Sequence, residues 1–385
     1  MNRKKLVIYI LLAVAVIMVV DFRFSSGPFN QFFETFITES LAEVQDMESE
    51  FFRGDFSDES VKAERTDSIE FANKEEIISS INQLKIKNNF GSIDVSSSAE
   101  KNLKADYKIK VHAENIEAAQ NYLENLSIDY NIDNQTLVVN LLDNNEDRPK
   151  SIRAVEIEYD LIVPRDLSLD LDNRFGKVSA VDIDGDLALK NKWGSTVLRQ
   201  IGGRSDIEVS YGELEIDEMA SKLSLNTSYT DNRIKNIEAE AEIISAYAFT
   251  SLENIESDLN INSRYGGFEI ENVKGSLNIE SDYTGLSLTS IDEKISAEIT
   301  YGDFRMRDIR EAEIKSSYAD ITLDNIRDLN DYNLDLRAEN AEISGDFELN
   351  TNKNGSIETY NQQSESADKS LIIESRFGDI IFRND

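Results

Sequence analysis

The residues best suited to metal chemistry form the acidic string Asp182, Asp184 and Asp186. Calcium takes about six to eight oxygen ligands, and closely spaced carboxylates can supply several of them. The rest of an EF-hand loop does not follow this string, and the glycine-rich nonapeptide of calcium-binding β-rolls is absent from the sequence. In a strand, alternate carboxylates simply face water. We therefore expect a solvated acidic edge here, with a calcium site as the alternative.

Residues for other catalysis are scarce. The only histidine, His112, lies in the strand-like segment YKIKVHA without a nucleophile motif, and the chain has no cysteine. A histidine-based triad, a multi-histidine metal site and a cysteine nucleophile are therefore unsupported. Carboxylate pairs alone can hydrolyse sugars, so a polysaccharide-acting β-helix enzyme is an alternative. No pair stands out among 74 acidic residues, and we expect a non-enzymatic protein without a cofactor.

Aromatic residues recur at a fixed interval of 18 residues. A small residue such as Gly194 or Gly212 often follows, as a tight corner requires. Stacked repeats would place the rings one above another, so we interpret this column as structural. The alternative is an exposed aromatic platform for sugar rings. The column comprises Phe175, Trp193, Tyr211, Tyr229, Tyr247, Tyr265, Tyr283 and Tyr301, and Tyr318 follows after 17 residues.

A second column lies seven residues after the aromatic positions. Its side chains are amides or carboxylates that could bond from one repeat to the next, as asparagine ladders do in stacked sheets. We expect this column to be structural as well. It comprises Asp182, Asn236, Asn254, Asn272, Asp308 and Asn325.

The segments between the aromatic positions must provide the scaffold. Apolar residues alternate with polar ones and change parity just after the aromatic and again before offset eight, which indicates strands joined at corners. Eighteen residues at roughly 3.3 Å span about 60 Å, enough for one closed coil. We predict an all-β, single-stranded-type β-solenoid (β-helix) over residues 166–385. RAENAEISGDFEL and KNGSIETYN are interpreted as irregular coils, and IIESRFGDIIF as the terminal coil.

Residues 77–165 are predicted to form a small α+β unit that caps the solenoid. QLKIKNNFGSIDVSSS resembles two strands that meet at residues 89–91, and residues 115–127 have helical spacing. Further strands are expected over residues 106–113, 128–132, 136–142 and 155–163.

The N-terminus predicts export. Basic residues Arg3, Lys4 and Lys5 precede fifteen apolar residues, Leu6 to Val20, and no signal-peptidase motif follows. We interpret residues 1–24 as an uncleaved signal anchor or transmembrane helix, with a cleaved signal peptide as the alternative. The bulk of the chain would then be extracytoplasmic on a single-pass membrane protein.

The amphipathic pattern of residues 25–76 predicts a juxtamembrane helix followed by a charged linker over residues 53–74. The helix would pack on the following domain, or associate with itself through residues 29–52, or lie on the membrane surface.

The charge balance excludes one class of partner. Forty basic residues stand against 74 acidic ones, and the net charge is −34. Such a chain repels phosphate backbones, so we expect no nucleic-acid partner.

Three segments carry a resemblance to a known family. They are LKIKNNFGSIDV, VEIEYDLIVP and LSLDLDNRFGKVSAVDIDGDLAL, followed by tandem Tyr-Gly-x-apolar-x-apolar repeats. Residues 80–385 thus resemble the bacterial "putative adhesin" β-solenoid family, related to domains of Lia-type cell-envelope stress proteins. The anchor, the regular repeats and the lack of a catalytic motif predict a non-enzymatic, adhesin-like cell-surface binding or scaffold module of the bacterial envelope, with cell-wall polymers or envelope proteins as partners. The alternative is an envelope-stress accessory protein that associates through the juxtamembrane helix. The resemblance carries over no catalytic residues.

Overall fold

The computed structural model describes residues 60–70, 80–98, 103–144 and 148–384. They divide into two compact units, of which the larger comprises Ala63–Val111, Gln120–Glu146 and Val155–Asp385. Within the described part of the chain no helix is both long and apolar enough to cross a bilayer. The predicted anchor over residues 1–24 and the helix over residues 29–52 lie outside the described residues.

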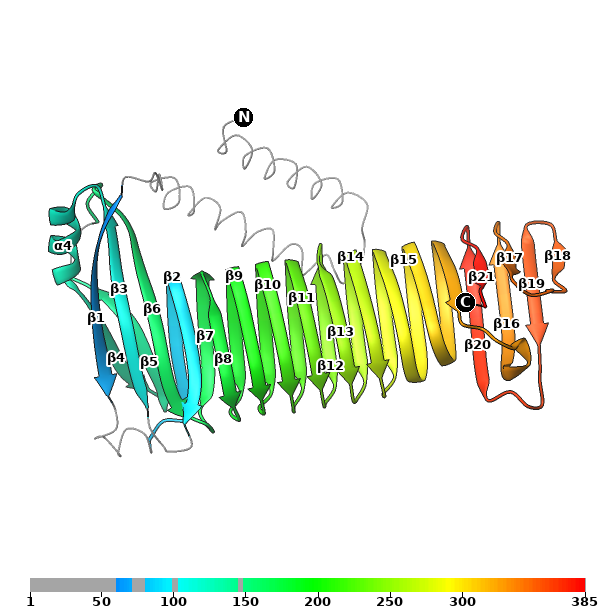
Figure 1. Cartoon of the computed structure of the whole chain (residues 1–385), viewed down its shortest axis with the longest axis horizontal. Coiled ribbons are helices and arrows are strands. Elements are labelled where there is room, and N and C mark those ends of the chain that lie inside the picture. Colours follow the sequence, from blue (N-terminus) through cyan, green and yellow to red (C-terminus); the bar gives the residue numbers. More distant parts are fainter. Residues whose placement is uncertain (1–59, 71–79, 99–102, 145–147, 385) are drawn as a thin grey trace. The chain divides into compact units, whose positions relative to one another are not determined.

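The described residues are nearly all in β-strands (Figure 1). One α-helix, α4 (Ile116–Glu124), matches the helix predicted over residues 115–127. In the smaller unit, the backbone NH of Ala118 donates to Asn115 Oδ1 at 2.8 Å, which caps this helix.

In the described part of the chain, the other elements before the repeats are strands. The linker predicted over residues 53–74 is wrong over residues 61–70, because Val61–Glu70 is a strand, β1, that pairs with β3. Edge strands commonly carry many charged side chains. The charged residues of this strand therefore gave it the composition of a linker. The strands are β1 (Val61–Glu70), β2 (Gln83–Ser98), β3 (Lys104–Ala113), β4 (Leu126–Asp133), β5 (Thr136–Asp143) and β6 (Ile152–Pro164).

The strands that follow repeat every 18 residues. Ile207 of β10 lies opposite Leu189 of β9 on one side and Leu225 of β11 on the other, always in parallel register. The backbone therefore advances by one strand spacing per repeat (Figure 1). These strands are β7 (Ser168–Phe175), β8 (Val178–Ile183), β9 (Leu187–Ile201), β10 (Ser205–Met219), β11 (Leu223–Ile237), β12 (Ala241–Ala246), β13 (Phe249–Ile255), β14 (Leu259–Val273) and β15 (Leu277–Asp324).

Two left-handed residues per repeat turn the chain. Tyr229 has φ 55° and Asn236 has φ 58°, and the equivalent positions of the neighbouring repeats have similar values. A left-handed residue interrupts the alternation of the strand, so side chains before and after it can both face inward. The predicted parity changes therefore correspond to these two corners. The inward side chains, including Leu214, Ile216 and Phe268, are almost fully buried.

The aromatic column stacks at the first corner. Tyr229 lies between Tyr211 and Tyr247, with ring centroids 4.9 and 4.8 Å apart and planes within 3°. At the second corner, Asn254 Nδ2 donates to Asn236 Oδ1 at 3.1 Å, and Asn272 Nδ2 to Asn254 Oδ1 at 3.2 Å. Side chains of both columns thus connect neighbouring repeats.

The ring stack begins earlier in the chain than the predicted start at Phe175. β2 pairs in parallel with β7 and β8 on one side and with β5 and β6 on the other. Phe90 consequently stacks on Phe175, with centroids 4.8 Å apart. The strand β2 of the predicted cap, 85 residues upstream, thus lies between strands β5 and β6 on one side and the first repeat on the other (Figure 1).

At the C-terminal end, too, a segment distant in the sequence is inserted between neighbouring strands. β20 (Lys369–Arg376) and β21 (Ile380–Phe382) lie between the last repeat of β15 and the strands β16 (Tyr332–Glu339) and β17 (Ile343–Gly345) (Figure 1). Phe377 stacks on Tyr318 at 4.8 Å. The prediction that IIESRFGDIIF is the terminal coil is therefore wrong, because this segment is internal to the stack.

The interpretation of KNGSIETYN as an irregular coil is also wrong. It forms the antiparallel strands β18 (Asn352–Asn354) and β19 (Ile357–Gln362), and β19 pairs with β16. A short 3-10 helix (Leu329–Asp331) precedes β16. An antiparallel hairpin ends the parallel register and leaves a short polar edge, which blocks further strand addition.

The stacked corner predicts a ranking of variants at Tyr229. Tyr229→Phe keeps both ring contacts and should change the unfolding free energy by less than about 1 kcal/mol. Tyr229→Ala loses both contacts but keeps the left-handed strain, and we expect a loss of about 2 to 3 kcal/mol. Tyr229→Asn should lose roughly 1 kcal/mol less than alanine, because asparagine tolerates this conformation. Urea denaturation measures all three, and an asparagine variant no better than alanine would contradict the strain argument.

The inserted C-terminal strand predicts one disulfide and excludes another. Glu313 of β15 is the register partner of Ile372 of β20, and Asp335 of β16 lies on the far side of Ile372. Neighbouring strands lie about 4.8 Å apart and next-but-one strands about twice that. In this cysteine-free chain, Glu313→Cys with Ile372→Cys should oxidise readily, whereas Glu313→Cys with Asp335→Cys should not. Mass spectrometry detects the disulfides. A disulfide in the 313/335 pair and none in the 313/372 pair would contradict the insertion of β20 between β15 and β16.

Candidate functional site

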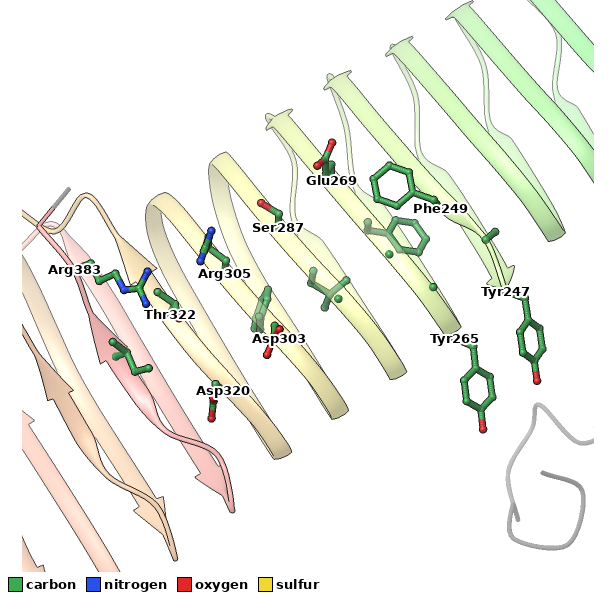
Figure 2. A pocket seen from close by; sticks show the side chains of 18 residues that line it. Tyr247, Phe249, Tyr265, Glu269, Ser287, Asp303, Arg305, Asp320, Thr322 and Arg383 are labelled. Atoms are coloured by element: carbon green, nitrogen blue, oxygen red, sulfur yellow. The ribbon is translucent and has the colours of Figure 1, made fainter. Parts of the chain in front are cut away.

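A groove crosses the outer face of the repeats, on the strand segments that follow the aromatic corner (Figure 2). Its volume is about 970 Å³. The lining comes from the repeats that begin at Tyr247, Tyr265, Tyr283, Tyr301, Tyr318 and Phe377, all within the larger unit. Outward side chains two and four residues after the corner form its floor and sides.

Two glycines produce the hollow. The outward column two residues after the corner contains Glu213 and Asp231 in earlier repeats, and Phe249, Gly267 and Gly285 follow in register. A Cβ added at Gly285 would meet nothing within 4 Å. Packing therefore does not require glycine at this position, and the missing side chain leaves the sheet surface open.

An exposed ring lies at one end of the groove. The Phe249 side chain is 45% exposed, although every other residue of its column from Lys177 to Asp320 is polar or glycine. A Cβ added at Gly267 would lie 3.0 and 3.2 Å from Cδ2 and Cε2 of Phe249. The ring thus occupies the space above Gly267 (Figure 2).

Charges of both signs line the remainder of the groove (Figure 2). Arg305 Nε lies 3.3 Å from Oδ2 of the buried Asp324. Asp320 Oδ1 accepts a hydrogen bond from the backbone NH of Asp379 at 2.8 Å. Glu269 and Asp303 are exposed carboxylates, and Arg383 is exposed as well. The backbone NH of Arg383 donates to Leu323 O at 2.8 Å and fixes the position of this residue. The site therefore offers hydrogen-bond donors and acceptors around the exposed ring of Phe249, with Tyr247 and Tyr265 of the stacked corner at its edge.

The aromatic column itself presents edges rather than faces. Tyr283 is 46% exposed and Tyr318 49% exposed, but each ring face contacts the next ring. Successive planes differ by at most 15°. A sugar that stacks on an aromatic residue needs a free ring face. The column therefore cannot act as the alternative sugar platform without opening the stack.

The stack also changes the acidity of its phenols. Burial raises the pKa of Tyr211 above its ordinary value of 10.0. Burial, followed by the neighbouring Tyr211 and Tyr247, raises the pKa of Tyr229. Both groups therefore stay neutral in the folded protein at a pH where the unfolded chain ionises them.

The acidic string contacts basic and polar groups. Arg165 Nη2 lies 2.6 Å from Asp182 Oδ1, and its Nε lies 2.8 Å from Asp184 Oδ2. Asp186 Oδ1 accepts from the backbone NH of Arg204 at 3.0 Å. In the part of the chain that the structure describes, no cluster of three or more carboxylate or histidine ligands is suited to a metal ion. Calcium at this string stays a prediction, and the arginine now competes with it.

Sequence reasoning missed three features of this surface. Phe90 and Phe377 join the ring stack, and both carried the aromatic-glycine pair that marks the other corners. The groove was missed altogether. Its signal was present in the outward column, where one phenylalanine and two glycines replace charged residues.

Comparison with known proteins gives a limited result. No family model and no curated protein matches the chain. A solved structure of a "putative cell adhesion protein" from Clostridium sporogenes is 11% identical, covers 84% of this chain and 99% of its own, and has a TM-score of 0.17. A "putative adhesin" from Parabacteroides merdae is 13% identical, covers 70% of this chain and 97% of its own, and has a TM-score of 0.28. A second "putative adhesin", from Bacteroides fragilis, is 14% identical, covers 83% of this chain and 97% of its own, and has a TM-score of 0.25. At such TM-scores these likenesses carry no argument about this chain.

The raised phenol pKa values predict alkaline destabilisation. The unfolded chain loses the phenol protons near pH 10, whereas the folded chain holds them. This contribution to stability is complete below that pH and is lost as the pH rises toward the raised pKa values. Tyr229→Phe removes one such group, so its unfolding free energy should fall less steeply above pH 10 than that of the wild type. Urea unfolding over a pH series measures this, and parallel curves would contradict it.

Proposed function

We propose that the protein is a non-enzymatic, adhesin-like binding or scaffold module of the bacterial envelope, whose repeats form a β-solenoid and whose groove holds the ligand. Register supports the solenoid, because strands of successive repeats pair in parallel at an interval of 18 residues. In this proposal the regular columns maintain the scaffold, and the departure from regularity at Phe249, Gly267 and Gly285 creates the binding surface.

The observation that carries the proposal is Gly285. Glycine in a strand weakens it, because glycine loses more backbone entropy and contributes no packing. Here the surrounding structure would accept a side chain without any contact. A residue that is unfavourable for the strand and unnecessary for packing fits a requirement for open space. We assign that space to a ligand.

The cellular setting of the proposal rests on the N-terminal sequence. Residues 1–24 would anchor the protein in the membrane, and the domains that follow, residues 77–165 and 166–385, would face the envelope. A net charge of −34 would keep such a chain soluble outside the cell and away from nucleic acid. Cell-wall polymers and envelope proteins are then the accessible partners.

A co-sedimentation experiment with the full chain in lipid nanodiscs tests this function. The nanodiscs are mixed with purified insoluble cell-wall sacculi, and bound protein is measured in the pellet. Wild type should sediment with the sacculi, and Gly285→Ile should lose most of this binding because a branched side chain fills the groove.

The matched control is Ser195→Ile. It adds the same side chain in the same outward column, three repeats before Phe249 and outside the groove. It should bind like the wild type. Equal binding by all three proteins would remove the groove from the account, and release of shortened glycan fragments would contradict the non-enzymatic role.

A further inference from the structure

We propose that the groove binds an extended, uncharged glycan, with the apolar face of one sugar ring stacked on the exposed face of Phe249. This inference rests on the proposed function and adds the chemical class of the ligand. Four observations lead to it: the placement of the ring, the pairing of the groove backbone, the balance of charges and the length of the groove.

Phe249 is positioned as a platform. Its ring occupies the space above Gly267, where even a methyl group would lie 3.0 Å from Cδ2. The ring therefore rests against the sheet and leaves about half of its surface to solvent. In contrast to the tyrosines of the corner, it is not part of the ring stack from Phe90 to Phe377. A planar apolar surface of this kind suits the axial C–H face of a pyranose ring, because such surfaces bury area at little entropic cost.

The backbone of the groove disfavours an added peptide strand. Gly267 pairs with Phe249 on one side and with Gly285 on the other, and Phe249 pairs with Asp231 on its far side, so these strands present no free edge at the ring. Strand addition needs an unpaired sheet edge. The occupant must instead be recognised through outward side chains.

The charges favour a neutral ligand rich in hydroxyl groups. Glu269, Asp303 and Asp320 would repel an anionic polymer, and the whole chain carries a net charge of −34. The guanidinium of Arg305 is offset by Asp324. Carboxylates accept and guanidinium groups donate several hydrogen bonds each, so together they can satisfy neighbouring hydroxyls of one sugar.

The groove is long enough for several sugars. Its lining spans five repeat intervals, from the Tyr247 repeat to the Phe377 repeat. At about 4.8 Å per strand spacing this is about 24 Å. A monosaccharide would occupy a small part of it, whereas an extended oligosaccharide would reach from Phe249 to Arg305 and Arg383.

Calorimetric titration of the full chain in nanodiscs tests the ligand class. The probes are chitohexaose, cellohexaose and xylohexaose as neutral glycans, and hexagalacturonate as the anionic one. At least one neutral probe should bind at least about tenfold more tightly than hexagalacturonate. Phe249→Ala should weaken that binding by at least about tenfold, whereas Phe249→Tyr, which keeps the ring face, should retain it.

A substitution at Gly267 and a matched control test the position of the ring. Gly267→Ala should displace the Phe249 ring and weaken binding several-fold. Ser195→Ala, in the same outward column but outside the groove, should leave binding within about twofold of wild type. Thermal unfolding of both variants identifies any loss caused by misfolding.

The outcomes separate this inference from the proposed function. If Gly285→Ile abolishes binding to sacculi but no neutral probe binds, the ligand class is wrong and the groove still functions. If hexagalacturonate binds most tightly, the charge argument is wrong. Neutral probes that bind equally to wild type and Phe249→Ala would place the glycan elsewhere and overturn the inference.

Discussion

Each repeat depends on a backbone conformation that most residues avoid. The chain turns at a residue in the left-handed conformation, which glycine and asparagine adopt at little cost. For a tyrosine this conformation costs roughly 1 to 2 kcal/mol. Stacking offsets this cost, because each ring between Phe90 and Phe377 gains a contact on each face, and each contact contributes about 0.5 to 1.5 kcal/mol. Where the rings end, Asn340 occupies the equivalent corner with φ 56°. The aromatic column thus stabilises a strained turn at its members from Tyr211 onward, whereas at Phe175 and Trp193 the following glycine has the positive φ.

The separation between the stacked rings at the corner and the outward column beside them determines where binding can occur. The rings between Phe90 and Phe377 are stacked on both faces, so this part of the column stabilises the corner and offers only edges and hydroxyls to solvent. Two residues further on, the side chains of the outward column lie outside the core, so the residue type can vary there without disturbing the corner; at Gly285 an added Cβ would meet nothing within 4 Å. Phe249, Gly267 and Gly285 are such variations. A scaffold built from regular positions therefore leaves neighbouring positions available for a ligand.

Local periodicity predicted the repeats well because it reports on side-chain contacts between neighbours 18 residues apart. The corners followed from Tyr229 and Asn236, whose spacing marks the parity changes. The insertion of β2 and β20 was not predicted, because Phe90 and Phe377 join the stack across 85 and 59 residues of intervening chain, where no period operates. The groove was missed for a different reason. An outward glycine such as Gly285 resembles a weak strand position until the structure shows open space beside it.

Radical footprinting of the full chain, with and without cell-wall sacculi, tests most directly the claim that the groove binds while the ring column supports. Oxidative labelling reports solvent access at individual aromatic side chains. We predict that Phe249 becomes protected by the sacculi, whereas Tyr301 and Tyr318, which are exposed and lie outside the groove lining, keep their reactivity. Protection of Tyr301 and Tyr318 with no change at Phe249 would contradict the account and return the binding role to the aromatic column.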